Sequence, residues 1–211
     1  MKKLIEDFTQ HLAHSIELSN NTELAPSSTD FSNVLICGLG GSGIGGSVAA
    51  QVVASDAKVP ININKDYHIP AFVNENTLVV ACSYSGNTEE SLEMIEQAQQ
   101  KGAHIACICS GGKLQEIAIE NNYNCIIIPG GHPPRGAFGF AIPALFNLLN
   151  HYNIISDYTA AFNSAINMIN ENEDAIRSEA MEITEKLNKK IPVIYADANY
   201  EGVAIRFRQQ I

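Results

Sequence analysis

The sequence predicts an α/β fold in which helices flank both faces of a five-stranded parallel sheet. Short apolar, β-branched runs recur along the chain, amphipathic segments separate them, and two of the runs end in stretches rich in glycine or serine. Strands buried on both faces appear as continuous apolar runs, and their alternation with helices indicates parallel strands joined by crossover helices. The composition, 45% hydrophobic and 17% charged over 211 residues, is that of a folded globular chain.

Four strong strands and one weaker strand are expected. The strong runs are Asn33–Leu39, Thr77–Ser83, His104–Cys109 and Cys125–Pro129. The weaker run, Val59–Asn64, is expected nearer an edge of the sheet, because Pro60 has no N–H to donate to a neighbouring strand. The intervening segments have apolar residues at helical spacing and predict helices over Ser42–Ser55, Thr88–Lys101 and Lys113–Asn121.

The two ends of the chain differ from this central region. Residues 2–19 predict an amphipathic helix, and the polar segment Asn20–Ser32 predicts a linker. Beyond the sheet we expect two helices, a strand and a final helix, over Gly136–Tyr152, Asp157–Lys189, Ile191–Asp197 and Glu201–Ile211.

These elements divide the chain into an N-terminal helix and linker (1–32), a sheet domain (33–152), a connecting helix (153–190) and the start of a second α/β unit (191–211). One strand and one helix cannot bury a core of their own. We therefore expect the sequence to be part of a longer chain, with its last segment disordered or packed against a neighbour.

Composition and charge exclude several classes of protein. The net charge is −10 and the Lys and Arg residues form no cluster, which argues against nucleic acid or an anionic membrane as a partner. No run reaches the roughly 18 apolar residues that a membrane span requires. Polar residues from Glu6 to His11 interrupt the first segment, which excludes a signal peptide, and we expect a cytoplasmic protein.

The five cysteines lie in the apolar runs and predict reduced, buried thiols. They are Cys37, Cys82, Cys107, Cys109 and Cys125. Cys107 and Cys109 are only two positions apart, which does not fit the usual C-x-x-C spacing of a zinc site. We therefore expect neither a metal nor another cofactor.

A first candidate site follows the first strand, at Gly38–Gly46 (GLGGSGIGG). Gly38, Gly40 and Gly43 satisfy the pattern G-x-G-x-x-G between a strand and a helix, where backbone N–H groups can bind an anion. A dinucleotide site also needs an acidic residue at the end of the second strand, a role that Asp66 could fill. From this loop alone, three interpretations remain open: a dinucleotide site, a site for another anion, and a purely structural glycine turn.

The second candidate site, Ser83–Glu90 (SYSGNTEE), favours an anion other than a dinucleotide. Hydroxyls at Ser83, Ser85 and Thr88 can converge on one phosphate, and Gly86 permits the sharp bend between them. The alternative is that Thr88 only caps the following helix, but a cap requires one such residue and not three around a glycine.

Three motifs resemble a known family. The segment SYSGNTEES is similar to the phosphosugar loop of SIS (sugar isomerase) domains. GLGGSGIGG and Gly130–Gly139 (GGHPPRGAFG) resemble loops of the bifunctional phosphoglucose/phosphomannose isomerases, with Gly43 in place of the more usual alanine and His132 at a variable position. Together these motifs cover residues 34–150, and Tyr200–Gln210 resembles the first helix of that family's second SIS domain.

The resemblance implies a flavodoxin-like, three-layer SIS domain and an aldose–ketose isomerase. The reaction would interconvert glucose 6-phosphate or mannose 6-phosphate with fructose 6-phosphate through a cis-enediolate. By motif match, Arg135 would stabilise the enediolate and Gly41 would line the sugar site, while the phosphate would be held by Ser42, Ser83, Ser85 and Thr88. A surface arginine after the Pro-Pro turn remains the alternative for Arg135.

The same resemblance places the general-base glutamate and a ring-opening histidine beyond Ile211. Glu201 lies too early to match, and His68, His132 and His151 are expected to be loop or surface residues. The 211-residue chain is therefore expected to bind substrate without isomerase activity, and the full-length protein is expected to be a homodimer.

Three other functions remain. A SIS-domain sensor of sugar phosphates usually carries a basic DNA-binding region, and residues 1–32 are neither basic nor long enough. A nicotinamide-dependent dehydrogenase is disfavoured by the serine-rich second loop. A single-domain isomerase of heptose phosphates is disfavoured by Gly130–Gly139.

Overall fold

The computed structural model describes residues 2–211 and contains a five-stranded sheet in the order β2-β1-β3-β4-β5. All four pairs of neighbouring strands are parallel. The weaker strand lies at an edge, as Pro60 predicted. The strands are β1 (Asn33–Cys37), β2 (Ile61–Asn64), β3 (Thr77–Ser83), β4 (His104–Cys109) and β5 (Asn124–Ile127).

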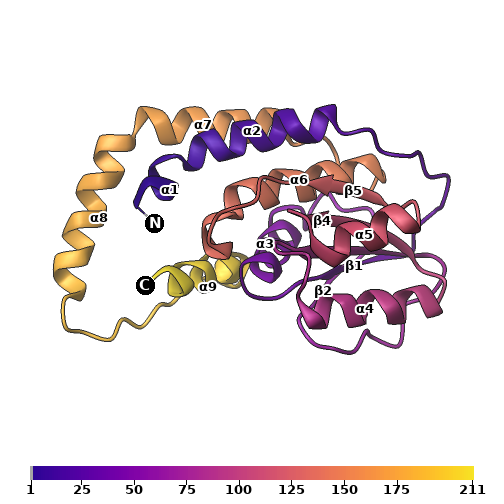
Figure 1. Ribbon diagram of the computed structural model, residues 1–211. Helices are drawn as coiled ribbons and strands as arrows, with labels where there is room; N and C mark the ends of the chain where they lie inside the picture. The colour runs from indigo at the N-terminus through magenta and orange to yellow at the C-terminus, as the bar shows by residue number, and fades with distance from the viewer. Residues whose placement is uncertain (1) are drawn as a thin grey trace.

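Helices cover both faces of this sheet, so the expected three-layer α/β/α fold is confirmed (Figure 1). One face is covered by α3 (Gly40–Val52) and α6 (Phe138–His151), and the other by α4 (Glu89–Gln100) and α5 (Gly112–Glu120). Outside α6 lies α2 (Phe8–Asn21), and α7 (Thr159–Glu171) runs beside α2.

Alternate strand residues belong to two separate cores. In β1, Ile36 packs into the core beneath α3 and α6, whereas Leu35 packs into the core beneath α4 and α5. Both side chains are fully buried. Burial on both faces explains the continuous apolar runs of the sequence. All five cysteines lie in strands as free thiols, and burial raises the pKa of Cys37 to about 12, so its reactive thiolate form is disfavoured.

The strand order reverses direction between β1 and β3. From β1 the chain crosses through α3 to β2 at one edge, and from β3 it proceeds through β4 to β5 at the other. In parallel α/β sheets, ligands bind beyond the carboxyl ends of the strands at such a switch point. Both candidate loops, after β1 and after β3, lie there.

Two expected helices are each divided. The first helix is split at Asp7 into α1 (Lys2–Glu6) and α2. The helix expected over Asp157–Lys189 is split at Asn172 into α7 and α8 (Glu173–Leu187). The Asn172 side chain donates a hydrogen bond to the Met168 carbonyl at 2.7 Å. The Asn172 backbone, at φ −110° and ψ 15°, lies outside the helical range, so the single long helix was the wrong prediction.

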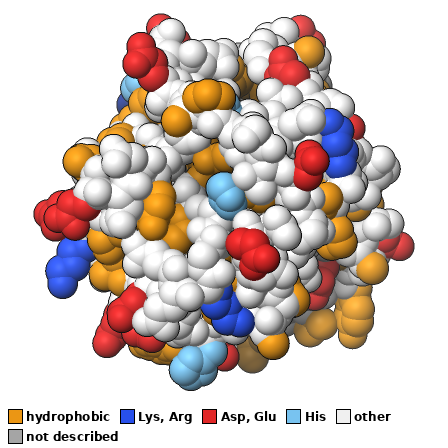
Figure 2. Space-filling model, turned by 90° about the vertical axis from the view of Figure 1, so that its right-hand side faces the viewer, with side chains coloured by type: hydrophobic (Ala, Val, Ile, Leu, Met, Phe, Trp, Pro, Cys, Tyr) orange, Lys and Arg blue, Asp and Glu red, His pale blue; other side chains and the backbone are white. Residues whose placement is uncertain are grey.

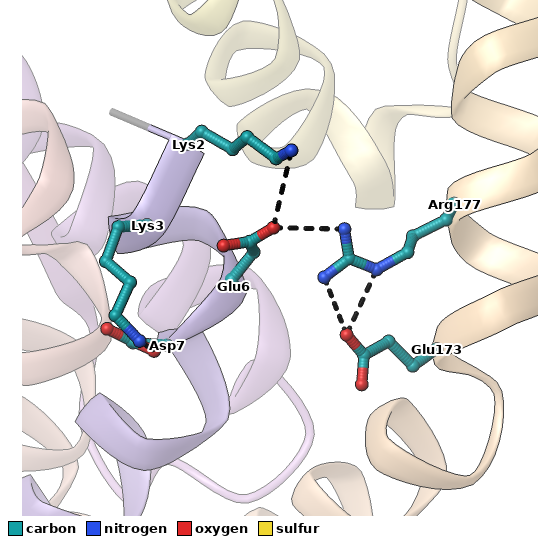
Figure 3. Close-up of polar contacts among 6 residues, drawn as sticks. All are labelled: Lys2, Lys3, Glu6, Asp7, Glu173 and Arg177. Carbon is teal, nitrogen blue, oxygen red and sulfur yellow. Dashed lines mark hydrogen bonds and ion pairs between the residues drawn. The ribbon is translucent and has the colours of Figure 1, made fainter.

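Helix α8 extends away from the sheet and is linked to α1 by the ion pair between Arg177 and Glu6 (Figure 3). Glu6 lies 3.1 Å from Arg177 and 3.9 Å from Lys2, and Arg177 also pairs with Glu173 at 2.7 Å. Lys3 pairs separately with Asp7 at 2.7 Å. Exposed pairs of this kind contribute about 0–1 kcal/mol each to the free energy of unfolding. They therefore orient the projecting arm, helix α8, more than they stabilise the protein.

The last segment departs from the prediction in two ways. Residues Ile191–Asp197 form no strand, and Ile191 and Tyr195 are 93% and 91% exposed. An isolated strand lacks a partner for its backbone groups, so the apolar pattern alone does not produce one. Helix α9 (Glu201–Gln210) is not disordered but contacts α3 of its own chain.

No helix within residues 2–211 combines the length and the apolar character needed to cross a membrane. Figure 2 shows the face on the right of Figure 1, where acidic, basic and hydrophobic side chains are interspersed. No block of basic side chains gathers on this face.

Candidate functional site

The first glycine loop packs directly against the end of β3. A Cβ atom added to Gly38 would lie 2.8 Å from the carbonyl oxygen of Cys82 and 3.2 Å from the backbone nitrogen of Gly43. Only a residue without a side chain allows this approach. The glycines found in the sequence therefore bring the loops after β1 and β3 into contact.

Helix α3 begins in this loop with free backbone donors. The N–H groups of Ser42 and Gly43 both donate to the Leu39 carbonyl, at 3.0 and 3.1 Å. Within residues 2–211, the N–H groups of Gly40 and Gly41 make no hydrogen bond. Such unpaired donors at a helix N-terminus form an anion site, and Ser42 lies in the first turn beside them.

The second loop brings two of the predicted hydroxyls together. The Oγ atom of Ser83 and the Oγ1 atom of Thr88 lie 2.9 Å apart, and Ser83 is only 2% exposed. Thr88 occupies the N-cap position of α4, but its hydroxyl makes no capping bond. The N–H groups of Glu90 and Ser91 also make no bond within residues 2–211. The capping alternative for Thr88 is therefore wrong.

Ser85 lies apart from this pair. It is exposed, and its Oγ atom accepts a hydrogen bond from the backbone N–H of Asn87 at 3.2 Å. No hydrogen bond within residues 2–211 joins Ser42 or Ser85 to Ser83. The structure thus brings two of the four predicted phosphate ligands, Ser83 and Thr88, into contact. Of the other two, Ser42 lies after β1 and Ser85 lies after β3.

The turn in the second loop depends on Gly86. Its φ angle is +66°, and a Cβ atom at this position would overlap the carbonyl oxygen of Gly111. The Gly86 carbonyl accepts a bond from the N–H of Leu114 at 2.9 Å, and the Asn87 side chain accepts one from the N–H of Lys113 at 3.0 Å. The segment that follows β4 therefore contacts and supports the loop Ser83–Glu90.

Tyr84 connects the second loop to the third, a role that the sequence analysis missed. Its hydroxyl donates to the Pro129 carbonyl at 3.1 Å and accepts from the backbone N–H of His132 at 2.9 Å. The only local signal was an aromatic residue between the two predicted phosphate serines. Tyr84 thereby links the third loop to the loop that carries Ser83 and Thr88.

The third loop places Arg135 beside the first. Arg135 lies in a 3-10 turn, Pro134–Gly136, and is exposed. A Cβ atom on Gly41 would lie 3.1 Å from the Pro134 carbonyl oxygen and 3.8 Å from the Arg135 Cα atom. The backbones of Gly41 and Arg135 are thus neighbours, and the exposed Arg135 side chain also fits a surface arginine.

His132, in the same loop, packs against an aromatic cluster. Its ring stacks on Phe140 with centroids 5.6 Å apart and lies 5.7 Å from the ring of His11. His11 is 8% exposed and its Nδ1 atom has no partner within residues 2–211. Burial, and then the neighbouring His132, lowers the pKa of His11. His132 therefore connects the loop to α2 and α6.

Arg206 on α9 also reaches the third loop, although it was not predicted as a site residue. Its Nη2 atom donates to the Arg135 carbonyl at 2.6 Å. A wide groove of about 1350 Å³ lies elsewhere, between the end of α8 and α9, and is lined by none of the predicted site residues. Residues 2–211 contain no group of three or more His, Cys, Asp or Glu side chains that could hold a metal ion.

Comparisons with known proteins identify the family of this chain. A family model of the SIS domain matches residues 29–150. A bifunctional phosphoglucose/phosphomannose isomerase of Caldicellulosiruptor bescii is 33% identical over 219 residues, covering 100% of this chain and 65% of that relative. A D-glucosamine-6-phosphate 4-epimerase of Sulfolobus acidocaldarius is 33% identical over 175 residues, covering 82% of this chain and 54% of that relative.

A solved structure shares the fold. The C-terminal domain of glucosamine-fructose-6-phosphate aminotransferase from Francisella tularensis superposes with a TM-score of 0.77 at 21% identity, covering 100% of this chain and 65% of that one. The chain thus spans no more than 65% of these related proteins.

Proposed function

Because the chain belongs to the SIS domain family, we propose that it forms the phosphosugar-binding part of an aldose–ketose isomerase. The reaction interconverts glucose 6-phosphate or mannose 6-phosphate with fructose 6-phosphate. The observation that carries the proposal is the Ser83–Thr88 hydroxyl pair, 2.9 Å apart, beside unpaired N–H groups of α4. Similarity to bifunctional phosphoglucose/phosphomannose isomerases supports it.

The phosphate site is built without a lysine or arginine cluster. Two helix N-termini, those of α3 and α4, meet at the switch point of the sheet, and each leaves backbone donors unpaired within residues 2–211. The hydroxyls of Ser42, Ser83, Ser85 and Thr88 add neutral donors to these N–H groups. Such a cradle suits a phosphate dianion in a chain of net charge −10, because the binding energy comes from oriented dipoles.

The sugar would extend from the phosphate towards Gly41 and Arg135. A guanidinium is always protonated and its fork of donors can bind two oxygens, so Arg135 suits the C1 and C2 oxygens of a cis-enediolate. We assign no general base to this chain. We therefore propose binding for these 211 residues, and turnover for a protein of the relatives' full length.

The homodimer and the cytoplasmic location are proposed for the full-length protein. Exposed apolar side chains on the projecting helix α8, Ile176, Met181 and Ile183, support packing against another subunit or domain. Light scattering of the full-length protein at micromolar concentration should give the mass of two chains. A strictly monomeric protein would contradict this part of the proposal.

Parallel titrations test the ligand. Calorimetry with fructose 6-phosphate should show saturable binding, and NADH should show none. Glucosamine 6-phosphate serves as a third ligand, because one relative is named as an epimerase of that sugar. Tighter binding of glucosamine 6-phosphate than of fructose 6-phosphate would favour the epimerase reaction, and binding of NADH alone would overturn the proposal.

A further inference from the structure

Arg135 and Arg206 meet at the edge of the first glycine loop, although 71 positions separate them in the sequence. Among the ion pairs of residues 2–211, none involves either arginine, in a chain that carries 23 acidic residues. Two guanidinium groups thus lie next to the anion loop with no carboxylate within residues 2–211 to neutralise them.

Arg206 is held in a defined position. Its guanidinium lies over the ring of Phe138, 4.7 Å from the centroid, and donates to the Arg135 carbonyl at 2.6 Å. With its oxygen facing Arg206, the Gln210 side chain accepts from the same guanidinium at 3.0 and 3.2 Å. A planar guanidinium stacked on an aromatic ring keeps its donors in a fixed direction, which a lysine cannot do.

The helix that carries Arg206 is itself held by a specific contact. The side-chain amide of Gln51 on α3 accepts from the N–H of Gly202 at 2.8 Å and donates to the Ala198 carbonyl at 3.0 Å. Arg206 follows Gly202 by four positions and therefore lies on the same face of α9. The packing of α9 against α3 thus places Arg206 next to the third loop, Gly130–Gly139.

The loop around Arg135 is held on three other sides. The hydroxyl of Tyr84 holds its beginning at His132, and the Pro134 carbonyl lies against Gly41. Gly136 lies beneath Leu4 so closely that a Cβ atom there would be 2.7 Å from its Cδ1 atom. The Arg135 carbonyl is the remaining contact, and Arg206 supplies its donor.

We propose that Arg206 is a positioning residue, which fixes the Pro134–Gly136 turn through the Arg135 carbonyl and thereby sets the place of the Arg135 guanidinium at the sugar. This inference rests on the proposed isomerase function. Arg206 acts through Arg135, so it should matter for recognition of the enediolate and not for recognition of the phosphate.

Two anions separate these effects in a calorimetric titration of the chain. Inorganic phosphate probes the cradle alone. A five-carbon aldonate 5-phosphate probes both parts, because its carboxylate mimics the enediolate. Arg206→Gln should weaken binding of the aldonate phosphate by about 10- to 150-fold, as expected if the displaced Arg135 loses one charged hydrogen bond to the carboxylate, and should leave inorganic phosphate within about 2-fold.

Arg208→Gln is the matched control, because Arg208 is exposed on the same helix and carries the same charge. It should leave both affinities unchanged. Arg206→Lys keeps the charge without the planar stack, so binding of the aldonate phosphate should stay reduced. This second variant also gives an answer if Arg206→Gln fails to fold.

Other outcomes overturn the inference. Equal losses for both anions in Arg206→Gln would indicate a general loss of charge or structure, and unchanged affinities would show that Arg206 has no role at the site. Full recovery by Arg206→Lys would show that charge alone suffices. If the wild-type chain binds neither fructose 6-phosphate nor the aldonate phosphate, the proposed function itself fails, and this inference fails with it.

Discussion

The hydroxyl groups of Ser83 and Thr88 lie 2.9 Å apart, one at the end of β3 and the other at the N-cap position of α4. Each hydroxyl has the other as its partner, and the first turn of α4 keeps unpaired N–H groups within residues 2–211. A phosphate oxygen could replace either partner and accept from the hydroxyls and the helix together.

The first prediction is that Ser83→Ala and Ser85→Ala each weaken fructose 6-phosphate binding. A lost hydrogen bond to a charged group costs about 1.5–3 kcal/mol, which corresponds to about 10- to 150-fold in affinity. Calorimetry measures the change, and Ser178→Ala on the exposed arm α8 is the control. Unchanged affinity in both site variants would remove these serines from the phosphate site.

The second prediction compares two glycines with similar backbone angles. Gly86 and Gly102 have φ angles of +66° and +70°, but a Cβ atom would overlap Gly111 only at Gly86, and at Gly102 it would meet nothing within 4 Å. Gly102→Ala should therefore cost only the left-handed strain, about 1–2 kcal/mol. Gly86→Ala should cost clearly more, because the supporting loop must move. Urea unfolding of both variants tests this, and equal losses would contradict the close contact.

The third prediction concerns pH. Burial and His132 lower the pKa of His11 in the folded protein, whereas the unfolded chain protonates near pH 6.5. Below that pH the unfolded state binds more protons, so the free energy of unfolding should fall as the pH drops through about 6.5 towards the lower folded pKa.

Its test is the difference between the wild type and His11→Gln in urea unfolding at several pH values. The difference isolates His11 from its titratable neighbours Asp7, His14 and His132, which both proteins retain. The stability gap between the two proteins should change between pH 7 and pH 5. A constant gap would show that His11 titrates normally.

The fourth prediction concerns the docking of α9. Gln51→Ala removes the bonds to Gly202 and Ala198, each contributing about 1 kcal/mol. Amide exchange in α9 should accelerate by about 10-fold or more, while exchange in β1 and β3 stays slow. Gln100→Ala, at the exposed end of α4, is the control and should change neither region. Unchanged exchange in α9 would show that Gln51 does not hold the helix.

The sheet could be predicted closely from the sequence. Thr77–Ser83 and His104–Cys109 were expected as strands and are strands with the same bounds, because burial on both faces makes such runs uniformly apolar. Pro60 predicted the edge position of β2 for an equally local reason, its missing N–H.

Elsewhere local patterns misled. Ile191–Asp197 has the composition of a strand, but a strand also requires a neighbour's backbone, and residues 2–211 supply none to it. Asn172 ends a helix that the apolar spacing would have continued, because its backbone angles, φ −110° and ψ 15°, lie outside the helical range.

The sequence by itself determined that glycines and hydroxyls stand at the ends of β1 and β3, because strand ends and turns follow from local periodicity and backbone freedom. Only the tertiary structure decided that Ser83 pairs with Thr88 while Ser85 bonds to Asn87. It also decided that Arg206 reaches Arg135. That contact depends on how α9 packs against α3, and packing between distant segments depends on the shapes of both surfaces, which no local pattern records.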